Sequence, residues 1–401
     1  MPSVILSINA GSSSLKCAVH DMDDAEMAVL NATVSGLADK PRLVLKQVGA
    51  PETVHEELPD TPLAAVEALR LVLAHLAGRG LLDGVCAVGH RIVHGGSEYV
   101  AVTRLDAAVL RNLERLTPLA PTHQDVNLAC AEAAMAALPG VPHFGCFDTA
   151  FHHDQPRLAR LYALPRELSA QGLQSYGFHG LSFAYIARRL EALIGERARG
   201  RIIIAHLGSG ASLCAIRGGR SIATTMGLTP LDGLPMSTRC GALDPGVVLH
   251  LIIDRDMAPS AVSEMLLQRS GLLGVSGLSG DMRELLASQR PEAEEAVSLF
   301  AYRAGRAIGS LAGALGGLDA IVFTAGIGEN APEIRRRICE ATGWLGVRLD
   351  AARNEAGELS ISDPASAVEV LVVPTDEQAM IVQLTQQQLQ RTGAALASDQ
   401  R

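Results

Sequence analysis

Short apolar runs alternate with amphipathic stretches along this 401-residue chain, a pattern typical of proteins in which strands and helices follow one another. Continuous apolar runs predict strands at residues 4–8, 15–19, 86–90, 141–147, 201–206, 211–217, 320–324 and 368–373. Apolar positions at helical spacing predict helices at residues 63–76, 106–116, 125–137, 261–267 and 292–315, from 332 onward, and at 377–389, with a frayed tail at 392–401. Strands followed by helices occur twice, so we predict a two-domain α/β protein with its ligand in the cleft between the domains.

A glycine-containing turn follows the first strand of each predicted half. The turns read INAGSSSL at residues 8–15 and AHLGSGAS at 205–212, and a shift of 197 (208 minus 11) aligns Gly11 with Gly208 and Cys17 with Cys214 without a gap. Such turns offer backbone N–H groups and hydroxyls to an anion such as phosphate. The match therefore predicts a duplicated unit with two phosphate-binding turns, and the alternative is that both are ordinary hairpin turns.

Composition and charge exclude several classes of protein. A hydrophobic content of 48% is enough for two packed cores, whereas a net charge of −9 and an aromatic content of 3% argue against a nucleic-acid partner. The first residues lack the basic region of a signal peptide, and the chain has no run of about 18 apolar residues that could cross a membrane. The seven cysteines are widely spaced without a C-x-x-C pair, so we expect a reduced, cytoplasmic protein.

Five sequence blocks make the fold and function more specific. They read NAGSSSLK at residues 9–16, GHRIVHGG at 89–96, YGFHG at 176–180, TPLDGL at 229–234 and TAGIGEN at 324–330. Together they resemble, in order and over nearly the whole chain, the acetokinase family within the superfamily of acetate and sugar kinases, heat-shock chaperones and actin. The resemblance implies a duplicated actin-like (ribonuclease H-like) α/β fold with the active site in the interdomain cleft. It implies a first domain at 1–150, closed by a C-terminal helix at about 379–396, a nucleotide-binding domain at 151–378, and a homodimer.

The resemblance implies a reversible, ATP-dependent phosphorylation of acetate, or another short-chain carboxylate, to an acyl phosphate. Transfer is direct and in-line, with ATP or ADP as substrate and Mg²⁺ as the metal, Mn²⁺ being an alternative ion. This chemistry needs cations to stabilise the charge on the transferring group. Arg91 and Arg239 lie in glycine-flanked loops, where a guanidinium can bind carboxylate and phosphoryl oxygens, although a lone loop arginine is more often a surface ion pair.

Two further catalytic residues come from the same blocks. By resemblance His179 donates a hydrogen bond to the transition state and Asp148 is the active-site acid. Asp148 closes a predicted buried strand, where an unpaired carboxylate would be costly. Because the acceptor carboxylate is already ionised, we expect Asp148 to orient the nucleophile or the hydrated metal rather than remove a proton.

The resemblance also implies the binding residues. Mg²⁺ is assigned to the oxygen ligands Asn9 and Glu377. The carboxylate site is assigned to Arg91, Val93, Thr122, His123, Phe178 and Pro230. The nucleotide is assigned to Lys16, Ser12 and Ser14 in the first turn, His206, Leu207, Gly208, Ser209 and Gly210 in the second, Asp281, Met282 and Arg283, and Gly326, Ile327, Gly328, Glu329 and Asn330.

Several positions depart from the family pattern. Thr122 replaces an apolar residue beside the acyl methyl group, Gln124-Asp125 replaces asparagine-proline, Ser209 replaces asparagine, and Gln378 replaces glutamate. Thr122 is shorter than leucine and its hydroxyl requires a hydrogen-bond partner. We therefore expect a roomier or more polar pocket that accepts propionate comparably to acetate.

Three alternative functions stay open at this stage. A propionate or butyrate kinase would use the same residues. Residues 326–331 fit the G-x-G-x-x-A pattern of a dinucleotide-binding turn between a strand and a helix, so an NAD-dependent oxidoreductase using the Gly326–Gly328 turn is a more distant alternative. A non-catalytic actin-like ATPase module would share the fold but would have no use for the carboxylate-binding arginines.

Overall fold

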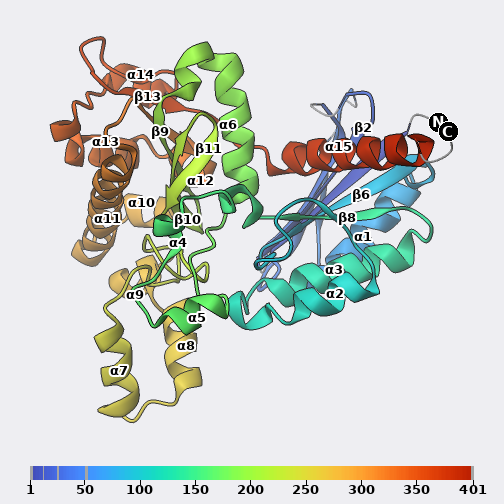
Figure 1. Ribbon diagram of the computed structural model, residues 1–401, viewed down its shortest axis with the longest axis horizontal. Coiled ribbons are helices and arrows are strands. Elements are labelled where there is room, and N and C mark those ends of the chain that lie inside the picture. The colour runs from blue at the N-terminus through green and yellow to red at the C-terminus, as the bar shows by residue number, and fades with distance from the viewer. Residues whose placement is uncertain (1–2, 12, 25–26, 50–52, 399–401) are drawn as a thin grey trace. The chain divides into compact units, whose positions relative to one another are not determined.

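The structure is a computed structural model that describes residues 3–11, 13–24, 27–49 and 53–398, with side chains through 391. The chain divides into two compact units (Figure 1). Unit 1 comprises Met1–Phe151 and Asp376–Arg401, and unit 2 comprises His152–Thr375. Each unit is built on one β-sheet with helices packed against it, so the predicted α/β class is confirmed.

The sheet of unit 1 has eight strands in the order β5-β4-β3-β2-β1-β6-β8-β7. Their bounds are β1 Val4–Ala10, β2 Ser14–Asp21, β3 Ala28–Ser35, β4 Arg42–Gln47, β5 Val54–Glu57, β6 Val85–Ile92, β7 Thr103–Arg104 and β8 His143–Phe147. Strands β1, β6 and β8 are parallel, whereas β1 to β5 form an antiparallel meander. The parallel strands are almost continuously apolar because helices cover both of their faces.

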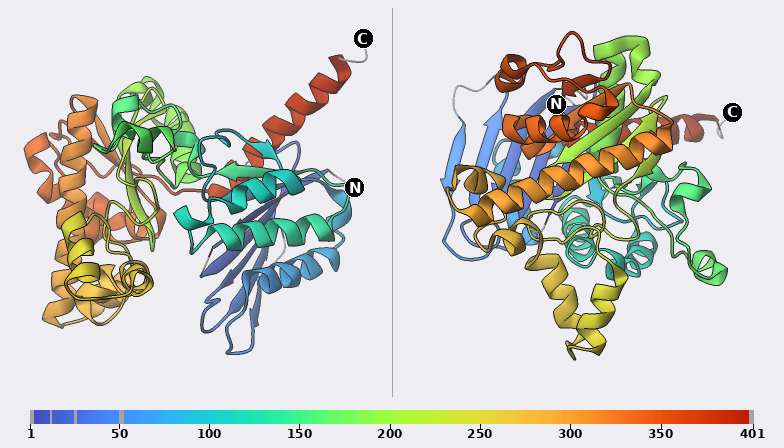
Figure 2. Two further views of the ribbon diagram at one scale, coloured as in Figure 1. Left: turned by 60° about the horizontal axis from the view of Figure 1, so that its bottom comes forward. Right: turned by 90° about the vertical axis from the view of Figure 1, so that its left-hand side faces the viewer.

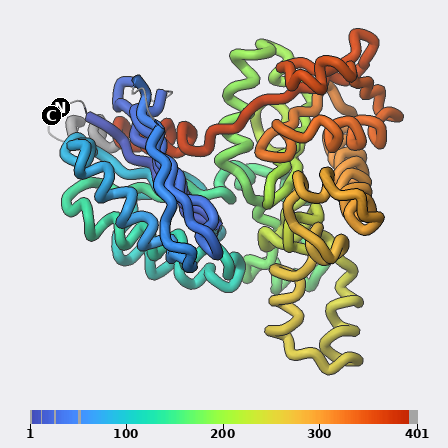
Figure 3. Tube along the Cα trace, turned by 180° about the vertical axis from the view of Figure 1, so that it is seen from behind, coloured from blue at the N-terminus to red at the C-terminus, as the bar shows by residue number. Residues whose placement is uncertain are grey.

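The helices of unit 1 are α1 Ala65–Ala77, α2 Ala107–Glu114, α3 Gln124–Ala137 and α15 Glu377–Ser398. They lie on both faces of this sheet, with α1 and α3 on one face and α15 on the other. Alternate residues of a strand point to opposite faces. Leu6 and Ile8 of β1 accordingly pack in the cluster that holds α1 and α3, whereas Ile5 packs with Val382 of α15. Figure 3 shows α15 running beside the strands of unit 1 although it ends the chain.

The close approach of α15 explains a glycine in β6. A Cβ atom on Gly89 would lie 2.5 Å from Ile381 Cγ2 and 2.3 Å from Thr385 Oγ1 of α15. These distances are shorter than a van der Waals contact, so any side chain at this position would push the helix away from the sheet.

The sheet of unit 2 has five strands in the order β11-β10-β9-β12-β13. Their bounds are β9 Arg201–Leu207, β10 Ala211–Arg217, β11 Arg220–Thr224, β12 Ala320–Thr324 and β13 Glu369–Val372. The α-helices are α4 Arg157–Arg160, α5 Arg166–Ala170, α6 Gly180–Ile194, α7 Pro245–Ile253, α8 Pro259–Gln268, α9 Gly271–Ser276, α10 Met282–Ala287, α11 Pro291–Leu315, α12 Ala325–Asn330, α13 Pro332–Ala341 and α14 Ala351–Ala356. Figure 2 shows the long helix α11 crossing this sheet, and α7 and α8 extending away from it as a helical hairpin.

The two sheets share one topology, which confirms the predicted duplication. In unit 1, the first two neighbouring pairs in the order β3-β2-β1-β6-β8 are antiparallel and the last two are parallel. In unit 2, the pairs in the order β11-β10-β9-β12-β13 follow the same sequence of directions. The gapless alignment of the two hairpins is wrong by one residue beyond the turn. Ile8 pairs with Cys17, but Ala205 pairs with Leu213, because four residues separate the last pair of the first hairpin and three separate that of the second.

The predicted strands and helices are all present, with shifts of a few residues at their ends. The tail is a correction: residues 392–398 continue helix α15 rather than fraying. Among the elements that the sequence pattern missed are α6, which begins in a segment rich in glycine, serine and aromatic residues, the meander strands β3 to β5, the edge strands β7 and β11, and α7. Among the described residues, no helix is long and apolar enough to cross a membrane.

Candidate active site

Three polar side chains of unit 1 lie at the carboxyl ends of its parallel strands. Asn9 is the penultimate residue of β1, Arg91 is the penultimate residue of β6, and Asp148 directly follows β8. The carboxyl ends of parallel strands meet at one edge of a sheet, where ligands bind in open α/β folds. Asn9 and Asp148 are both buried, so their polar atoms need partners.

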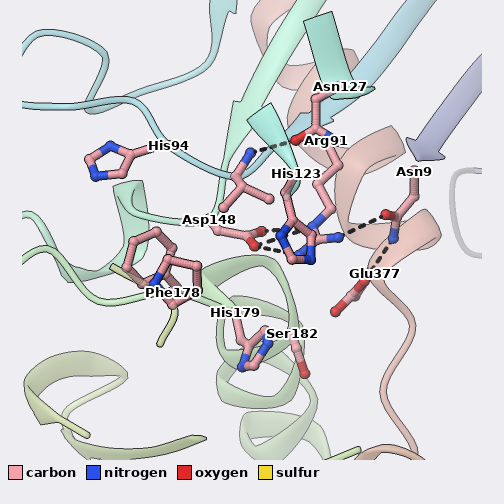
Figure 4. Close-up of polar contacts among 12 residues, drawn as sticks. Asn9, Arg91, His94, His123, Asn127, Asp148, Phe178, His179, Ser182 and Glu377 are labelled. Atoms are coloured by element: carbon pink, nitrogen blue, oxygen red, sulfur yellow. Dashed lines mark hydrogen bonds and ion pairs between the residues drawn. The ribbon is translucent and has the colours of Figure 1, made fainter. Parts of the chain in front are cut away.

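Arg91 is the centre of this cluster (Figure 4). Its Nε lies 3.2 Å from both carboxylate oxygens of Asp148, and its Nη2 lies 2.7 Å from Oδ2. Its Nη1 donates to Asn9 Oδ1 over 3.2 Å. Burial opposes the charge of Arg91, but the carboxylates of Asp148 and Glu377 outweigh it and raise the pKa of Arg91. Three of the five guanidinium N–H groups are used here, which leaves two that could bind a substrate anion.

Glu377 completes the unit 1 cluster from the first turn of α15. Asn9 Nδ2 donates to Glu377 Oε2 over 2.7 Å, so the two predicted metal ligands are in direct contact. Both supply oxygen atoms, and Mg²⁺ is usually bound by one or two protein oxygens together with substrate phosphates and water. The donor set therefore fits a hydrated Mg²⁺. Over the described ranges, no group of three or more histidine, cysteine, aspartate or glutamate side chains could hold a metal by itself.

Buried amides that the sequence did not identify hold the loop after β6. Asn127 of α3 accepts from Val93 N over 2.9 Å and donates to Ala10 O over 2.7 Å. Gln124 accepts from His94 N over 3.1 Å and donates back to His94 O over 3.0 Å. Gln124, which departs from the family pattern, thus fixes the backbone of the loop that carries Val93 through two hydrogen bonds to His94.

The predicted acyl-site residues of unit 1 lie in two segments. Val93, two residues after Arg91 in the chain, is buried, and Thr122 and His123 immediately precede α3. The Thr122 hydroxyl lies 2.7 Å from His123 Nδ1, so it has the partner that the sequence required. In the first hairpin, the exposed residue Lys16 is the cross-strand partner of Asn9, and Ser14 opens β2. Ser12 lies outside the described residues.

Unit 2 holds a second cluster around the turn after β9. His179 directly precedes α6, with a left-handed φ of 57°, and its Nδ1 lies 2.8 Å from Ser212 Oγ on β10. Its ring stacks on that of His206 with centroids 4.3 Å apart, and His206 Nδ1 lies 2.8 Å from Ser182 Oγ. Because the Nδ1 atoms of both rings face serine hydroxyls, the Nε2 atoms face away from them.

Gly210 marks the point at which two predicted catalytic groups meet. A Cβ atom on Gly210 would lie 3.1 Å from His179 Nε2 and 3.1 Å from Arg239 Nη2. Arg239 Nη1 is fixed by the carbonyl of Pro230 over 2.7 Å. A glycine is therefore required where an imidazole, a guanidinium and the backbone of the turn converge. Such a set of donors suits a phosphoryl group.

Most of the remaining predicted nucleotide-binding residues form hydrogen bonds or ion pairs within their own segments. In the turn after β9, Leu207 is buried, Gly208 N donates to Gly210 O over 3.0 Å and the carbonyl of Ser209 accepts from Ser237 N over 3.2 Å. Asp281 caps α10 and forms an ion pair with Arg283 over 2.5 Å, while Met282 is buried.

The segment after β12 is a short helix rather than a dinucleotide-binding turn. Glu329 Oε1 accepts from Ala325 N over 2.7 Å and from Thr375 N over 3.1 Å, which holds Ala325 at a left-handed φ of 65°. Gly328 is buried, Ile327 is half-buried, and Asn330 Nδ2 donates to Gly326 O over 2.9 Å. The helix α12 spans only Ala325–Asn330, too short for the long helix of a Rossmann unit.

Comparisons with known proteins agree with this geometry. The model of the acetokinase family matches residues 4–383. An acetate kinase of Rhodopseudomonas palustris is 46% identical over 387 residues, covering 95% of this chain and 97% of that protein. An acetate kinase of Rhizobium meliloti is 47% identical over 389 residues, with the same shares covered.

Solved structures are similar over nearly the whole chain. A propionate kinase from Francisella tularensis superposes with a TM-score of 0.88 at 32% identity, covering 96% of this chain and 99% of that one. Acetate kinase from Porphyromonas gingivalis gives a TM-score of 0.83 at 35% identity, covering 96% and 100%.

Proposed function

Because the chain belongs to the acetokinase family, it is a phosphotransferase with a carboxyl group as acceptor, and we propose that it converts acetate and ATP reversibly to acetyl phosphate and ADP. The observation that carries the proposal is the meeting of His179 Nε2 and Arg239 Nη2 at Gly210. An NAD-dependent oxidoreductase has no use for this set of donors, and a non-catalytic ATPase module has none for Arg91 and Asp148.

The acceptor carboxylate is assigned to the unit 1 cluster. The two remaining N–H groups of Arg91 can bind its oxygens, and Val93, Thr122 and His123 are proposed to line the acyl group together with Phe178 and Pro230. One carboxylate oxygen attacks the γ-phosphorus, the bond from that phosphorus to the bridging oxygen breaks, and the electron pair leaves with ADP. No proton is transferred, so Asp148 orients Arg91 and the nucleophile rather than acting as a base.

The metal is assigned to Asn9 and Glu377, whose oxygens fit Mg²⁺ or Mn²⁺. When bound, the ion neutralises charge on the nucleotide phosphates. Glu377 also acts on the proposed carboxylate site, because its charge contributes to raising the pKa of Arg91.

The nucleotide is assigned to unit 2, with Lys16, Ser12 and Ser14 of unit 1 reaching its phosphates. We propose that residues 206–210 bind phosphates, and that residues 281–283 and 326–330 bind the adenosine. During transfer negative charge is spread over the equatorial oxygens, and Arg239 and His179 stabilise it with donors already held in place by Pro230 and Ser212.

The experiment is to trap acyl phosphate as a hydroxamate after incubation with ATP, Mg²⁺ and acetate, propionate or butyrate in turn. We expect hydroxamate with acetate and comparable amounts with propionate, because Thr122 is smaller than leucine. A preference for propionate over acetate would make the chain a propionate kinase. No hydroxamate with any acid, under conditions in which ADP binds, would contradict the proposed reaction.

Location and assembly are proposed on the same basis. All seven cysteines are free, and five of them are buried, which suits a reducing compartment such as the cytoplasm. The family resemblance supports a homodimer, and light scattering during gel filtration measures the mass that tests it.

A further inference from the structure

His152 is a buried histidine of unit 2 that no part of the proposed reaction uses. It ends the short helical turn Ala150–His152 and is only 1% exposed. Its Nε2 lies 2.9 Å from the carbonyl oxygen of Phe178, and its Nδ1 lies 2.8 Å from Ser221 Oγ on β11. The ring therefore joins the edge strand β11 to the peptide bond that precedes His179.

The partners of His152 determine where its proton lies. A carbonyl oxygen can only accept, so Nε2 carries the hydrogen and donates it to Phe178. Burial lowers the pKa of His152 to about 4, and the bond to Phe178 only partly offsets this, so the ring is neutral near pH 7 and Nδ1 accepts from the Ser221 hydroxyl. Gln155 Nε2 donates to Ser221 Oγ over 2.8 Å and so fixes the direction of that hydroxyl. The imidazole of His152 is therefore held in one orientation and one tautomer, with the hydrogen on Nε2.

The bond to the Phe178 carbonyl matters because the next residue in the chain is His179. His179 has a left-handed φ of 57°, a conformation that a non-glycine residue keeps only when its surroundings impose it. Gly177, with a φ of 78°, lies against the His152 ring so closely that a Cβ atom would be 2.6 Å from its Cγ and Cδ2 atoms. The 177–179 segment is thus shaped by His152 on one side and by the Ser212 bond to the His179 ring on the other.

We propose that His152 is a positioning residue for phosphoryl transfer. By fixing the peptide between Phe178 and His179, it places the His179 ring toward Gly210 and Phe178 toward the acyl group. His152 itself touches no substrate and transfers no proton. The proposal rests on the proposed function, because it assigns Phe178 to the carboxylate site and His179 to the transition state.

The test compares His152→Leu, which removes the donor, with His152→Gln, whose amide N–H can reach the same carbonyl. Steady-state kinetics give kcat and the KM for acetate, and calorimetry gives the Kd for ADP. For His152→Leu we expect kcat to fall by about 100-fold, the order produced by a misplaced catalytic group, with a raised KM for acetate and an ADP Kd within about twofold of wild type. His152→Gln should recover most of the lost kcat.

Two further variants keep the test decisive. His153→Leu makes the same change at the exposed neighbouring residue and should leave kcat unchanged. Ser221→Ala removes the second bond of His152 and the bond that Ser221 accepts from Gln155, but it keeps the bond from His152 to Phe178. We therefore expect a smaller fall in kcat with unchanged ADP binding.

Unchanged kcat and acetate KM in folded His152→Leu would overturn the proposal. So would parallel losses of ADP binding and thermal stability in both His152→Leu and Ser221→Ala, because the residue would then serve only the fold. If the proposed function itself is wrong, the result differs from these, because the wild-type protein would bind ADP and yet form no acetyl phosphate.

Discussion

The hairpin β1–β2 of unit 1 and the hairpin β9–β10 of unit 2 occupy the same place in matching sheets but carry opposite kinds of chemistry. Near the first turn, Asn9 pairs across the strands with Lys16 and contacts Arg91 and Glu377. Near the second, His206 pairs with Ser212 and stacks on His179. Unit 1 thus gathers both carboxylates and cations, whereas the unit 2 hairpin gathers imidazoles and hydroxyls beside the guanidinium of Arg239.

On the proposed site assignment, the difference shows how a duplicated scaffold divides one reaction. Charged groups such as Arg91 and Asp148 suit a small carboxylate and a metal, which are themselves fully charged. A turn of backbone N–H groups, bordered by imidazoles that serine hydroxyls orient, suits phosphate oxygens that approach closely and change charge during transfer. On the proposed assignment, the shared strand order supports two binding chemistries, because the side chains at the carboxyl ends of the strands differ between the units.

The largest expected effect is the loss of a catalytic cation from either unit. Arg91→Ala and Arg239→Ala should each lower kcat by about 100–1,000-fold, the effect typical of removing one donor to the developing charge. Arg91→Ala should also lower the free energy of unfolding by about 3–5 kcal/mol, because the buried carboxylate of Asp148 would lose its ion pair with Arg91. Acetyl phosphate assays and urea unfolding measure the two quantities. Turnover close to wild type in either variant would contradict the site assignment.

Filling the space at Gly210 should have the next largest effect. In Gly210→Ala the added methyl group would lie 3.1 Å from His179 Nε2 and Arg239 Nη2, so one of them must move. We expect kcat to fall by about 10–100-fold, since small displacements of catalytic groups cost up to about 100-fold. Gly313→Ala is the matched control, because its Cβ meets nothing within 4 Å in helix α11. Equal kinetics in the two variants would mean that nothing reacts near Gly210.

A pH effect should come from unit 1, through the buried pair His90 and His143. His90 Nε2 lies 2.9 Å from His143 Nδ1, so one ring must accept and cannot be protonated there without losing the bond. Burial lowers the pKa of His143 to about 4, whereas an unfolded histidine has a pKa near 6.5.

Between these pH values the unfolded chain binds more protons, so the free energy of unfolding falls as the pH falls from 6.5 to 4. The loss from His143 alone is about 3 kcal/mol, at about 1.36 kcal/mol per pKa unit. Thermal unfolding at pH 7, 5.5 and 4.5 measures it, and His143→Leu should flatten the dependence. An unchanged slope in that variant would assign the acid sensitivity to other groups.

The smallest expected effect concerns acyl selectivity at Thr122. Thr122→Leu enlarges the side chain and should reduce kcat/KM for propionate relative to acetate by about 10-fold, within the 1–3 kcal/mol that one methylene is worth. Thr122→Val keeps the size but removes the bond to His123, so it separates volume from hydrogen bonding. If neither variant changes the ratio, position 122 does not contact the acyl chain.

The fold was largely predictable because its central strands are buried on both faces and read as continuous apolar runs. The one-residue error between the hairpins arose because a short match cannot show that the first turn is longer. Ser212 and His152 were missed for another reason. Their importance lies in contacts with His179 and Phe178, 33 and 26 residues away, and no local pattern records which residues the fold brings together.

The position of α15 has a consequence for synthesis on the ribosome. Unit 1 begins the chain, yet Val382 closes its core beside Ile5 and Glu377 contacts Asn9. Residues 152–375 are translated in between, and they form unit 2 from one continuous stretch. At about 5–20 residues per second, the 224 residues from 152 to 375 (375 minus 151) take roughly 10 to 45 s to make. The β6 face around Gly89 therefore stays uncovered while the second unit can fold, and Glu377, the proposed metal ligand, is synthesised only after that unit.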